Sequence, residues 1–222
     1  MKAPAPWQLS GRAYIGTLAL PEQQRVAEAG TPERLGRPGG RLSTLMFVDY
    51  EDSNVGPYYE LLFIPGHFPF ADGRRHPSIG RIYVSSQASV DNGRANWGIP
   101  KDRADFRVYR EAHQDRVEVS HNGQVFARLT LRHRGPSLPV PGGLIPSRWR
   151  TLGQVRDGQT FLYAPKASGW LSRARLAHAW ADGEHFPAIQ HGKVRGTGYL
   201  SGFDMTFPEA RILPDSPDGE PA

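Results

Sequence analysis

The chain has 222 residues, of which 38% are hydrophobic, and this is long enough for one well-buried core. It contains no cysteine, which excludes disulfides, thiolate metal sites and cysteine nucleophiles. No apolar run reaches the roughly 18 residues of a membrane helix, and the first seven residues lack the apolar stretch of a signal peptide, so we expect a cytoplasmic protein without a membrane partner.

The positive charge does not indicate a nucleic-acid partner. The formal net charge is +5, but the arginines alternate with acidic residues, as in residues 103–107 and 115–118, which is typical of exposed strand faces. A nucleic-acid site more often concentrates arginines beside stacking aromatic residues. We therefore expect no nucleic-acid binding, and the positive field suits an acidic small molecule.

Alternation of apolar and polar side chains predicts a mainly β protein. The expected strands, in chain order, are Leu9–Leu18, Arg41–Tyr50, Tyr58–Ile64, Gly80–Ser89, Ala104–Tyr109, Arg116–His121, Gln124–Arg132, Phe161–Ala164, Gly169–Trp180 and Lys193–Phe207. Asn122-Gly123 predicts a type I′ hairpin, because that turn needs positive φ at both central residues. One helix is expected from Pro21 to about Ala29, and a short helical turn at Gln87–Gly93.

The chain is expected to form a single domain over residues 1–213, followed by a disordered tail at residues 214–222. The Pro- and Gly-rich segment Gly135–Pro146 could be a linker between domains. We interpret it instead as a long loop or extended edge segment, because strands resume after it and neither side alone has enough strands to close.

The common metal and cofactor motifs are missing from the sequence. The eight histidines do not cluster at ligand spacing, and no phosphate-binding loop, dinucleotide fingerprint or serine nucleophile elbow occurs. We expect neither a metal nor a cofactor.

Lys101 is the most informative single residue. The chain has 27 basic residues and only four of them are lysines, one of which ends the rigid apolar stretch Asn96–Lys101. Arg and Lys are equivalent as exposed charges, but only a lysine can lose its proton near neutral pH and attack a carbonyl to form a Schiff base. The alternative is an ordinary surface lysine after a turn.

The segment Gly93–Lys101 resembles the active-site segment of the acetoacetate decarboxylase family, in which a Gly-Arg pair precedes a Pro-Lys pair at this spacing. Three further segments are similar to the family in the same order along the chain: Arg12-Ala13-Tyr14, Tyr58-Tyr59-Glu60 and Phe207–Ala210. The resemblance implies that Lys101 forms the Schiff base, that Glu60 positions substrate or moves protons, and that Arg12 binds a carboxylate.

The same resemblance implies a β-rich α+β fold around a closed or cone-like antiparallel β-barrel that holds the site inside. It also implies a keto acid as the small-molecule substrate and assembly as a homo-oligomer. Tyr58, Phe63 and Trp97 are expected to form the apolar wall of the pocket. Arg94 is also expected among the pocket residues, where it pins the turn before Lys101 by hydrogen bonds more than it touches substrate.

One departure from the family is Asp102, which stands where its decarboxylases carry a second lysine. Since adjacent residues of an extended segment point to opposite sides, Asp102 is expected to face solvent or an arginine. Desolvation by Trp97 and Ile99 must then lower the pKa of the amine. Three functions remain open: decarboxylation of a β-keto acid, an aldolase-dehydratase reaction of pyruvate or a related keto acid, and non-catalytic binding of a small molecule.

Overall fold

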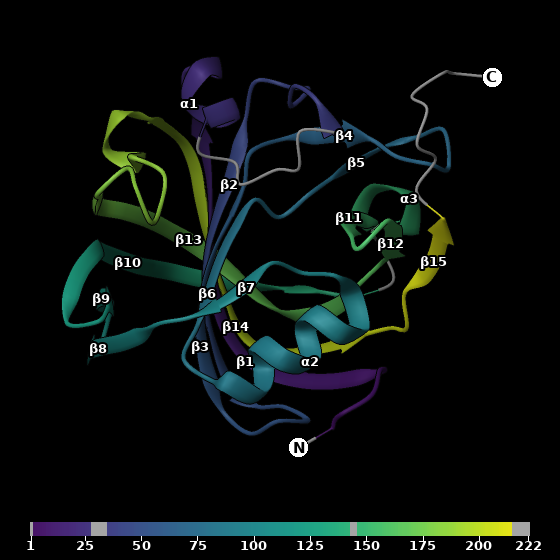
Figure 1. Ribbon diagram of the computed structural model, residues 1–222. Helices are drawn as coiled ribbons and strands as arrows, with labels where there is room; N and C mark the ends of the chain where they lie inside the picture. The colour runs from purple at the N-terminus through teal and green to yellow at the C-terminus, as the bar shows by residue number, and fades with distance from the viewer. Residues whose placement is uncertain (1, 28–34, 143–145, 215–222) are drawn as a thin grey trace.

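The computed structural model describes residues 2–27, 35–142 and 146–214. A ten-stranded sheet dominates it (Figure 1). In spatial order the strands are β7 (Lys101–Arg103), β6 (Arg81–Val84), β3 (Tyr58–Ile64), β2 (Ser43–Asp52), β1 (Trp7–Ala19), β14 (Lys193–Phe207), β13 (Lys166–Ala181), β10 (Gln124–Val140), β9 (Gln114–His121) and β8 (Asp105–Glu111).

The sheet curls until its two edges meet. The edge strands β7 and β8 follow one another in the chain with only Ala104 between them, and the Ala104 amide donates a hydrogen bond of 3.0 Å to the carbonyl of Val84. Every neighbouring pair in the sheet is antiparallel except β6 and β7, which are parallel. The expected mainly β barrel is therefore confirmed, as a nearly closed barrel of mixed rather than purely antiparallel pairing.

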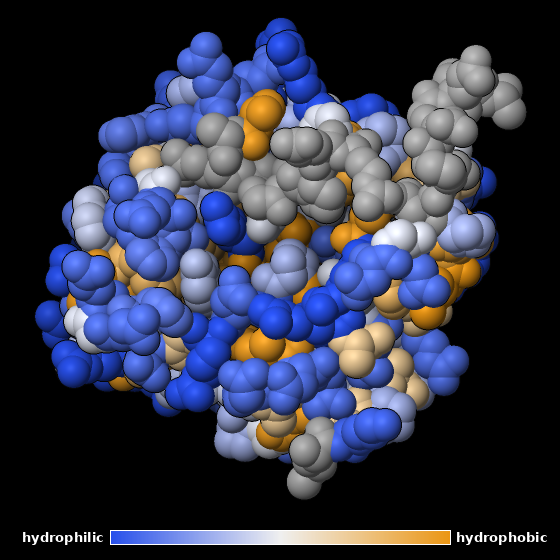
Figure 2. Space-filling view, viewed as in Figure 1, coloured by the Kyte–Doolittle hydropathy of each residue, from blue (hydrophilic) through white to orange (hydrophobic). Residues whose placement is uncertain are grey.

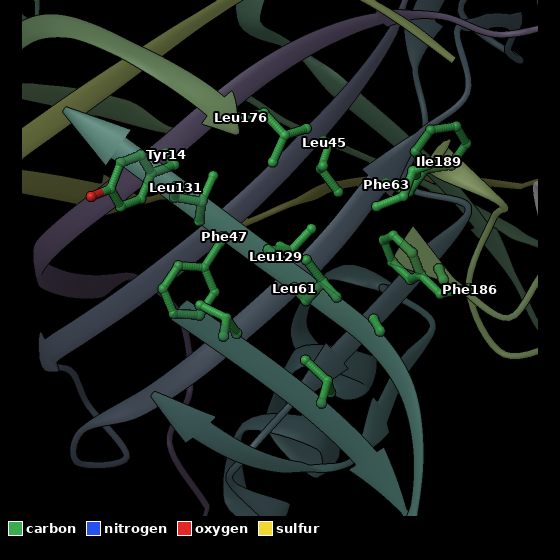
Figure 3. Packing of buried hydrophobic residues seen from close by; sticks show 14 of the residues in the cluster. Tyr14, Leu45, Phe47, Leu61, Phe63, Leu129, Leu131, Leu176, Phe186 and Ile189 are labelled. Carbon is green, nitrogen blue, oxygen red and sulfur yellow. The ribbon is translucent and has the colours of Figure 1, made fainter. Parts of the chain in front are cut away.

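The β3 strand divides two hydrophobic cores, because successive side chains of a strand point to opposite faces. Leu61 and Phe63 lie in a core enclosed by the curled sheet, where Figure 3 shows them beside Leu129 of β10 and Phe186. Tyr58 and Leu62 point the other way, into a second core on the outer face of the sheet.

Outer elements cover this second core. They are α2 (Gln87–Trp97) and a small sheet of β11 (Leu152–Arg156), β12 (Gln159–Tyr163) and β15 (Arg211–Pro214), which lie together on one side of the barrel in Figure 1. Trp97 packs edge-on against Trp7 of β1, with ring centroids 5.1 Å apart. The remaining elements are α1 (Glu22–Ala27), β4 (His67–Pro69), β5 (Arg75–Pro77), α3 (Ser147–Arg150) and a 3₁₀ turn at Ile189–His191.

Several local predictions can be compared directly with these elements. The bounds of β3 are as expected, and φ is positive at both Asn122 (50°) and Gly123 (78°), as the predicted hairpin requires. The strand expected to reach Ser89 ends at Val84 instead. Ser86 then caps α2, its side chain accepting from the amide of Ser89 at 3.3 Å, so that the predicted helical turn is a full helix.

The Pro- and Gly-rich segment, expected to be a long loop or an extended edge segment, is extended as far as Val140. β10 continues through it and pairs with β13, with Leu138 opposite Leu171. Residues 143–145 lie outside the described part, as do residues 28–34 beyond α1 and residues 215–222 of the expected tail, whose first residue, Pro214, ends β15. On the face drawn in Figure 2, hydrophilic side chains cover most of the surface, with hydrophobic patches between them. No described helix is long and apolar enough to cross a membrane.

Candidate active site

A cavity of about 250 Å³ lies between the outer face of the sheet and the elements that cover it. Its polar lining consists of Tyr50, Tyr58, Glu60, Lys101 and Arg150. Its apolar lining consists of Trp7, Leu9, Met46, Leu62, Ile64, Pro77, Ile79, Ile82, Trp97, Ile99, Leu152, Pro165, Met205 and Phe207. The site therefore lies on the outer face and not, as expected, in the barrel interior, because the inner face is filled by its own core.

Strand register brings Lys101 into this cavity. Lys101 pairs with Ile82, Ile82 with Leu62, and Leu62 with Met46, so the four residues form a row across β7, β6, β3 and β2. All four line the cavity. Lys101 is only 4% exposed, which excludes the alternative of an ordinary surface lysine.

Three polar side chains meet at the amine of Lys101. Its Nζ donates to Oε2 of Glu60 at 2.8 Å and to Oγ of Ser89 at 3.0 Å, and it lies 5.2 Å from the centre of the Tyr58 ring. The Tyr50 hydroxyl donates to the other Glu60 oxygen at 3.3 Å. Glu60 is 3% exposed, so the ion pair is buried. Ser89, Tyr58 and Tyr50 contact it from three sides.

The electrostatics of Lys101 differ from expectation. Burial is the largest single influence and acts to lower the pKa of the amine. The carboxylate of Glu60 at 2.8 Å and the Tyr58 side chain together outweigh burial, so the pKa is raised above its ordinary value of 10.5. Desolvation by Trp97 and Ile99 therefore does not by itself produce a neutral amine. The nearest group that can take the proton is Glu60.

The two tyrosines of the site stay protonated. Burial raises the pKa of Tyr58 to about 12, although Lys101 acts in the opposite direction, and burial together with Glu60 raises the pKa of Tyr50 well above 10. Both hydroxyls therefore remain hydrogen-bond donors at any physiological pH.

Helix α2 fixes the backbone of the lysine. Arg94 donates from Nε to the carbonyl of Lys101 at 2.8 Å and from Nη2 to the carboxylate of Asp102. The Asp102 side chain is 56% exposed and turned away from the cavity, as predicted from strand alternation. Gly93 packs against Lys101 so closely that a Cβ there would lie 2.8 Å from the lysine Cδ. Arg94 thus pins the turn and does not line the cavity, although it was expected among the pocket residues.

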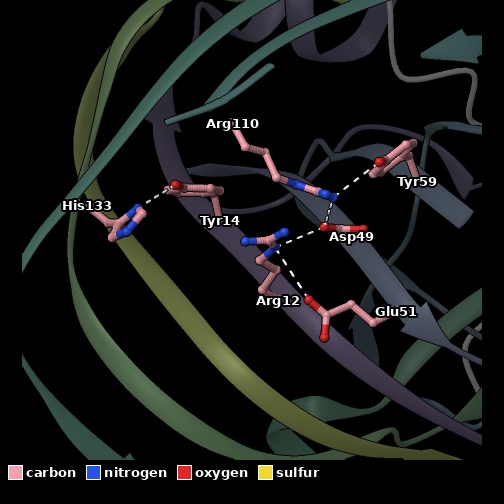
Figure 4. Close-up of polar contacts among 7 residues, drawn as sticks. All are labelled: Arg12, Tyr14, Asp49, Glu51, Tyr59, Arg110 and His133. Atoms are coloured by element: carbon pink, nitrogen blue, oxygen red, sulfur yellow. Dashed lines mark hydrogen bonds and ion pairs between the residues drawn. The ribbon is translucent and has the colours of Figure 1, made fainter. Parts of the chain in front are cut away.

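Arg12 does not reach the cavity, contrary to its expected role there. It pairs in register with Asp49, whose β3 partner is Tyr59, so its side chain points to the face opposite Glu60. Figure 4 shows its Nε bound to Asp49 at 2.9 Å, beside Arg110 of β8, which also binds Asp49. This group joins β1 and β2 to the edge strand β8 through side-chain contacts.

Phe63 was expected in the pocket wall and is also on the wrong face. It is fully buried in the inner core and packs against Phe186, whereas its neighbours Leu62 and Ile64 line the cavity. Tyr58 and Trp97 do line the cavity as expected.

Three polar residues of the site were not found from the sequence. Ser89 fell where an expected strand and the expected helical turn overlap, and the serine at position 86, which can cap a helix, is the signal that would have assigned it to the helix. Tyr50 was placed at the end of a predicted strand, and its position next to Tyr58 follows only from the β2–β3 register. Arg150 lies on α3, for which the sequence offers no periodic pattern.

A cluster away from the cavity could hold a cation. Ligand atoms of Asp182, Glu184 and His185 lie within 4.8 Å of one another, but the first two residues are exposed and the His185 Nδ1 already pairs with Asp182 at 2.7 Å. None of the three lines the cavity.

The family model for acetoacetate decarboxylase matches residues 32–166. Similar solved structures include one from structural studies of acetoacetate decarboxylase, with a TM-score of 0.69 and 13% identity over 98% of this chain and 93% of the other. The acetoacetate decarboxylase of Legionella pneumophila has a TM-score of 0.65 and 15% identity over 96% and 89%. The enduracididine biosynthesis enzyme MppR complexed with pyruvate has a TM-score of 0.65 and 15% identity over 97% and 93%. No curated protein sequence matches the chain.

Proposed function

Because the chain belongs to the acetoacetate decarboxylase family, we propose that it is a Schiff-base-forming lyase that decarboxylates a β-keto acid through an imine on Lys101. The observation that carries this proposal is the buried lysine amine, 2.8 Å from a buried carboxylate, in a cavity whose described lining is mostly apolar. An amine in such a place is costly to maintain, and perturbed, buried ionisable pairs in a cleft are typical of catalytic sites.

In the proposed reaction Glu60 first takes a proton from the Lys101 ammonium. The neutral amine attacks the ketone carbon, and loss of water leaves a protonated imine. The bond between the carboxylate and the α-carbon then breaks, its electrons move to the imine nitrogen, and carbon dioxide leaves an enamine. Glu60 has returned its first proton to the departing water, so it takes a second proton from solvent and gives it to the α-carbon. Water then hydrolyses the new protonated imine to release the ketone and the Lys101 ammonium.

Tyr50 and Ser89 support these steps. The Tyr50 hydroxyl donates to Glu60 and so stabilises its carboxylate form after each proton transfer. Ser89 accepts from the lysine nitrogen and holds it toward the cavity. The loss of charge as carbon dioxide departs is favoured by the apolar walls, since an ionised carboxylate is poorly solvated there.

An aldol reaction of pyruvate or a related keto acid is the second candidate. The observation that favours it is the similarity to MppR, which has been seen with pyruvate and with the condensation product of pyruvate and imidazole 4-carboxaldehyde. The same imine on Lys101 would provide the nucleophilic enamine. Release of carbon dioxide from a β-keto acid distinguishes the two reactions.

The test is borohydride trapping with a panel of keto acids, followed by peptide mass spectrometry. We expect reduction to attach the keto acid carbon skeleton to Lys101, and Lys101→Arg to lose both the label and turnover, because arginine keeps the charge but cannot form the imine. Lys193→Arg, at an exposed position of β14, is the matched control and should keep both. Full turnover in Lys101→Arg would overturn every Schiff-base function.

A further inference from the structure

We propose that the substrate carries an extended apolar group on its ketone carbon, such as an alkyl chain of several carbons, where acetoacetate carries a methyl group. This inference rests on the proposed function, because it names the substrate class of the same site. It comes from the distribution of polarity in the cavity and from the length of its apolar wall.

Polar side chains are concentrated at one place in the cavity. Tyr50, Tyr58, Glu60 and Lys101 contact one another around the amine, and Arg150 is the one further polar residue among the described lining. A small, hydrated keto acid would be bound by polar groups around its whole surface. Here such groups surround the carbon that reacts, and apart from Arg150 the rest of the described lining is hydrocarbon.

The apolar wall continues well beyond that point. Along β3 the lining residues Glu60, Leu62 and Ile64 alternate on one face, so the wall extends about 13 Å past Glu60 at roughly 3.3 Å per residue. Pro77 and Ile79 extend the same side of the cavity. Acetoacetate, with only a methyl group beyond its ketone, would leave this wall facing water.

Leaving the wall uncovered has a measurable consequence. Each buried methylene contributes about 0.8 kcal/mol of transfer free energy, which corresponds to about a fourfold gain in affinity. The wild-type protein should therefore process 3-oxobutanoate, 3-oxohexanoate and 3-oxooctanoate with kcat/KM values that rise about fourfold for each methylene added. Equal or falling values along this series would overturn the inference.

A binding measurement separates this inference from the proposed chemistry. Butanoate, hexanoate and octanoate have no ketone and cannot form an imine, and their binding by calorimetry should tighten by about the same factor per methylene. Tightening without borohydride labelling of Lys101 by keto acids would leave the apolar site standing and remove the Schiff-base function. Labelling of Lys101 without any dependence of binding on alkyl chain length would support the Schiff-base function and refute the apolar site.

A variant locates the effect in the wall. Ile64→Trp fills the far end of the β3 wall, so the ratio of kcat/KM for 3-oxooctanoate to that for 3-oxobutanoate should fall at least tenfold, about two methylenes of lost burial. Val194→Trp, at a site 41% exposed on β14 and outside the cavity, is the control and should keep the wild-type ratio. An unchanged kcat/KM ratio in a folded Ile64→Trp protein would show that the alkyl chain of the substrate binds elsewhere, and it would refute the proposed wall.

Discussion

Lys101 and Glu60 form a pair whose two members depend on each other. Burial alone would lower the pKa of the amine, but the neighbouring carboxylate raises it. In the proposed reaction the amine therefore becomes nucleophilic by passing its proton over 2.8 Å to Glu60 and not by releasing it to solvent. The environment that disfavours a charge on either residue alone keeps the proton within the pair.

Glu60→Gln tests this dependence. Without the carboxylate only burial and the tyrosines act on Lys101, so the pKa of the amine should fall and the pH midpoint of borohydride labelling should move to lower pH. Turnover should fall by about 10²- to 10⁴-fold, the usual effect of losing a positioned acid or base. Glu111→Gln removes an exposed strand carboxylate that pairs with Arg116 and should change neither value. A labelling midpoint that moved to higher pH would contradict the proposed origin of the shift.

A site residue could be predicted where its chemistry identified it. It could not be predicted where its place in the site depended only on which face of the strand its side chain points to. Lys101 and Glu60 follow from their motifs, and the structure brings them together. Arg12 and Phe63 have suitable chemistry but lie on the other face of their strands. A one-residue difference in position reverses the direction of a strand side chain, and the sequence does not state which face will line the cavity.

At the scale of an element, α2 acts as the support of the lysine. Its C-terminal turn ends at Gly98 with φ of 64°, its Arg94 holds the Lys101 carbonyl, and its Gly93 leaves room for the lysine side chain. The alternation of side chains predicted a strand that continues through Ser89, because the residues from Ser86 to Val90 are compatible with either a strand or a helix. Capping by Ser86 decided in favour of the helix, and it brought Ser89 to the amine.

Gly93→Ala separates the positioning of Lys101 by α2 from the stability of the fold. Alanine has a higher helix propensity than glycine by about 1 kcal/mol, so the helix itself should not weaken. The new Cβ would displace the Lys101 side chain, from which it would stand 2.8 Å away, and a shift of about 1 Å in a reacting group can reduce the rate about 10²-fold.

We therefore expect kcat to fall by one to two orders of magnitude, on the order of that estimate, while the melting temperature stays within a few degrees or rises. Asp91→Ala makes a comparable change in helix propensity at an exposed position of α2 and should preserve kcat. A Gly93→Ala protein with wild-type kcat would show that the lysine tolerates displacement and that the close packing has no catalytic role.

At the scale of the whole molecule, the barrel depends on contacts that periodicity does not reveal. The parallel β6–β7 pairing is three residues long on each strand, and Arg110 reaches from β8 to Asp49 on β2. Both join segments that are distant in the chain, and neither interrupts the local alternation. The mainly β class could therefore be predicted from the sequence, whereas the mixed pairing and the outer position of the site could not.

We expect the protein to assemble as a homo-oligomer through the far ends of β10 and β13. There Leu138 and Leu171 are paired across the strands on one face of the sheet and are 70% and 40% exposed. Large apolar side chains that gather on one exposed sheet face are typical of an interface. The positive net charge of +5 opposes self-association, so an apolar contact must provide the attraction.

Analytical ultracentrifugation of the wild-type protein should thus show a species heavier than the 24.6 kDa chain. The double variant Leu138→Glu, Leu171→Glu should shift it toward the monomer, because two carboxylates would have to be desolvated at the contact. Tyr109→Glu introduces the same charge at a site 57% exposed on β8 and serves as the control, with sedimentation as in the wild type. Dissociation caused by Tyr109→Glu but not by the double variant would place the interface at the β8 edge. A wild-type protein that sediments as a monomer would leave the β10–β13 face without a partner copy, and the site would then have to be complete within one chain.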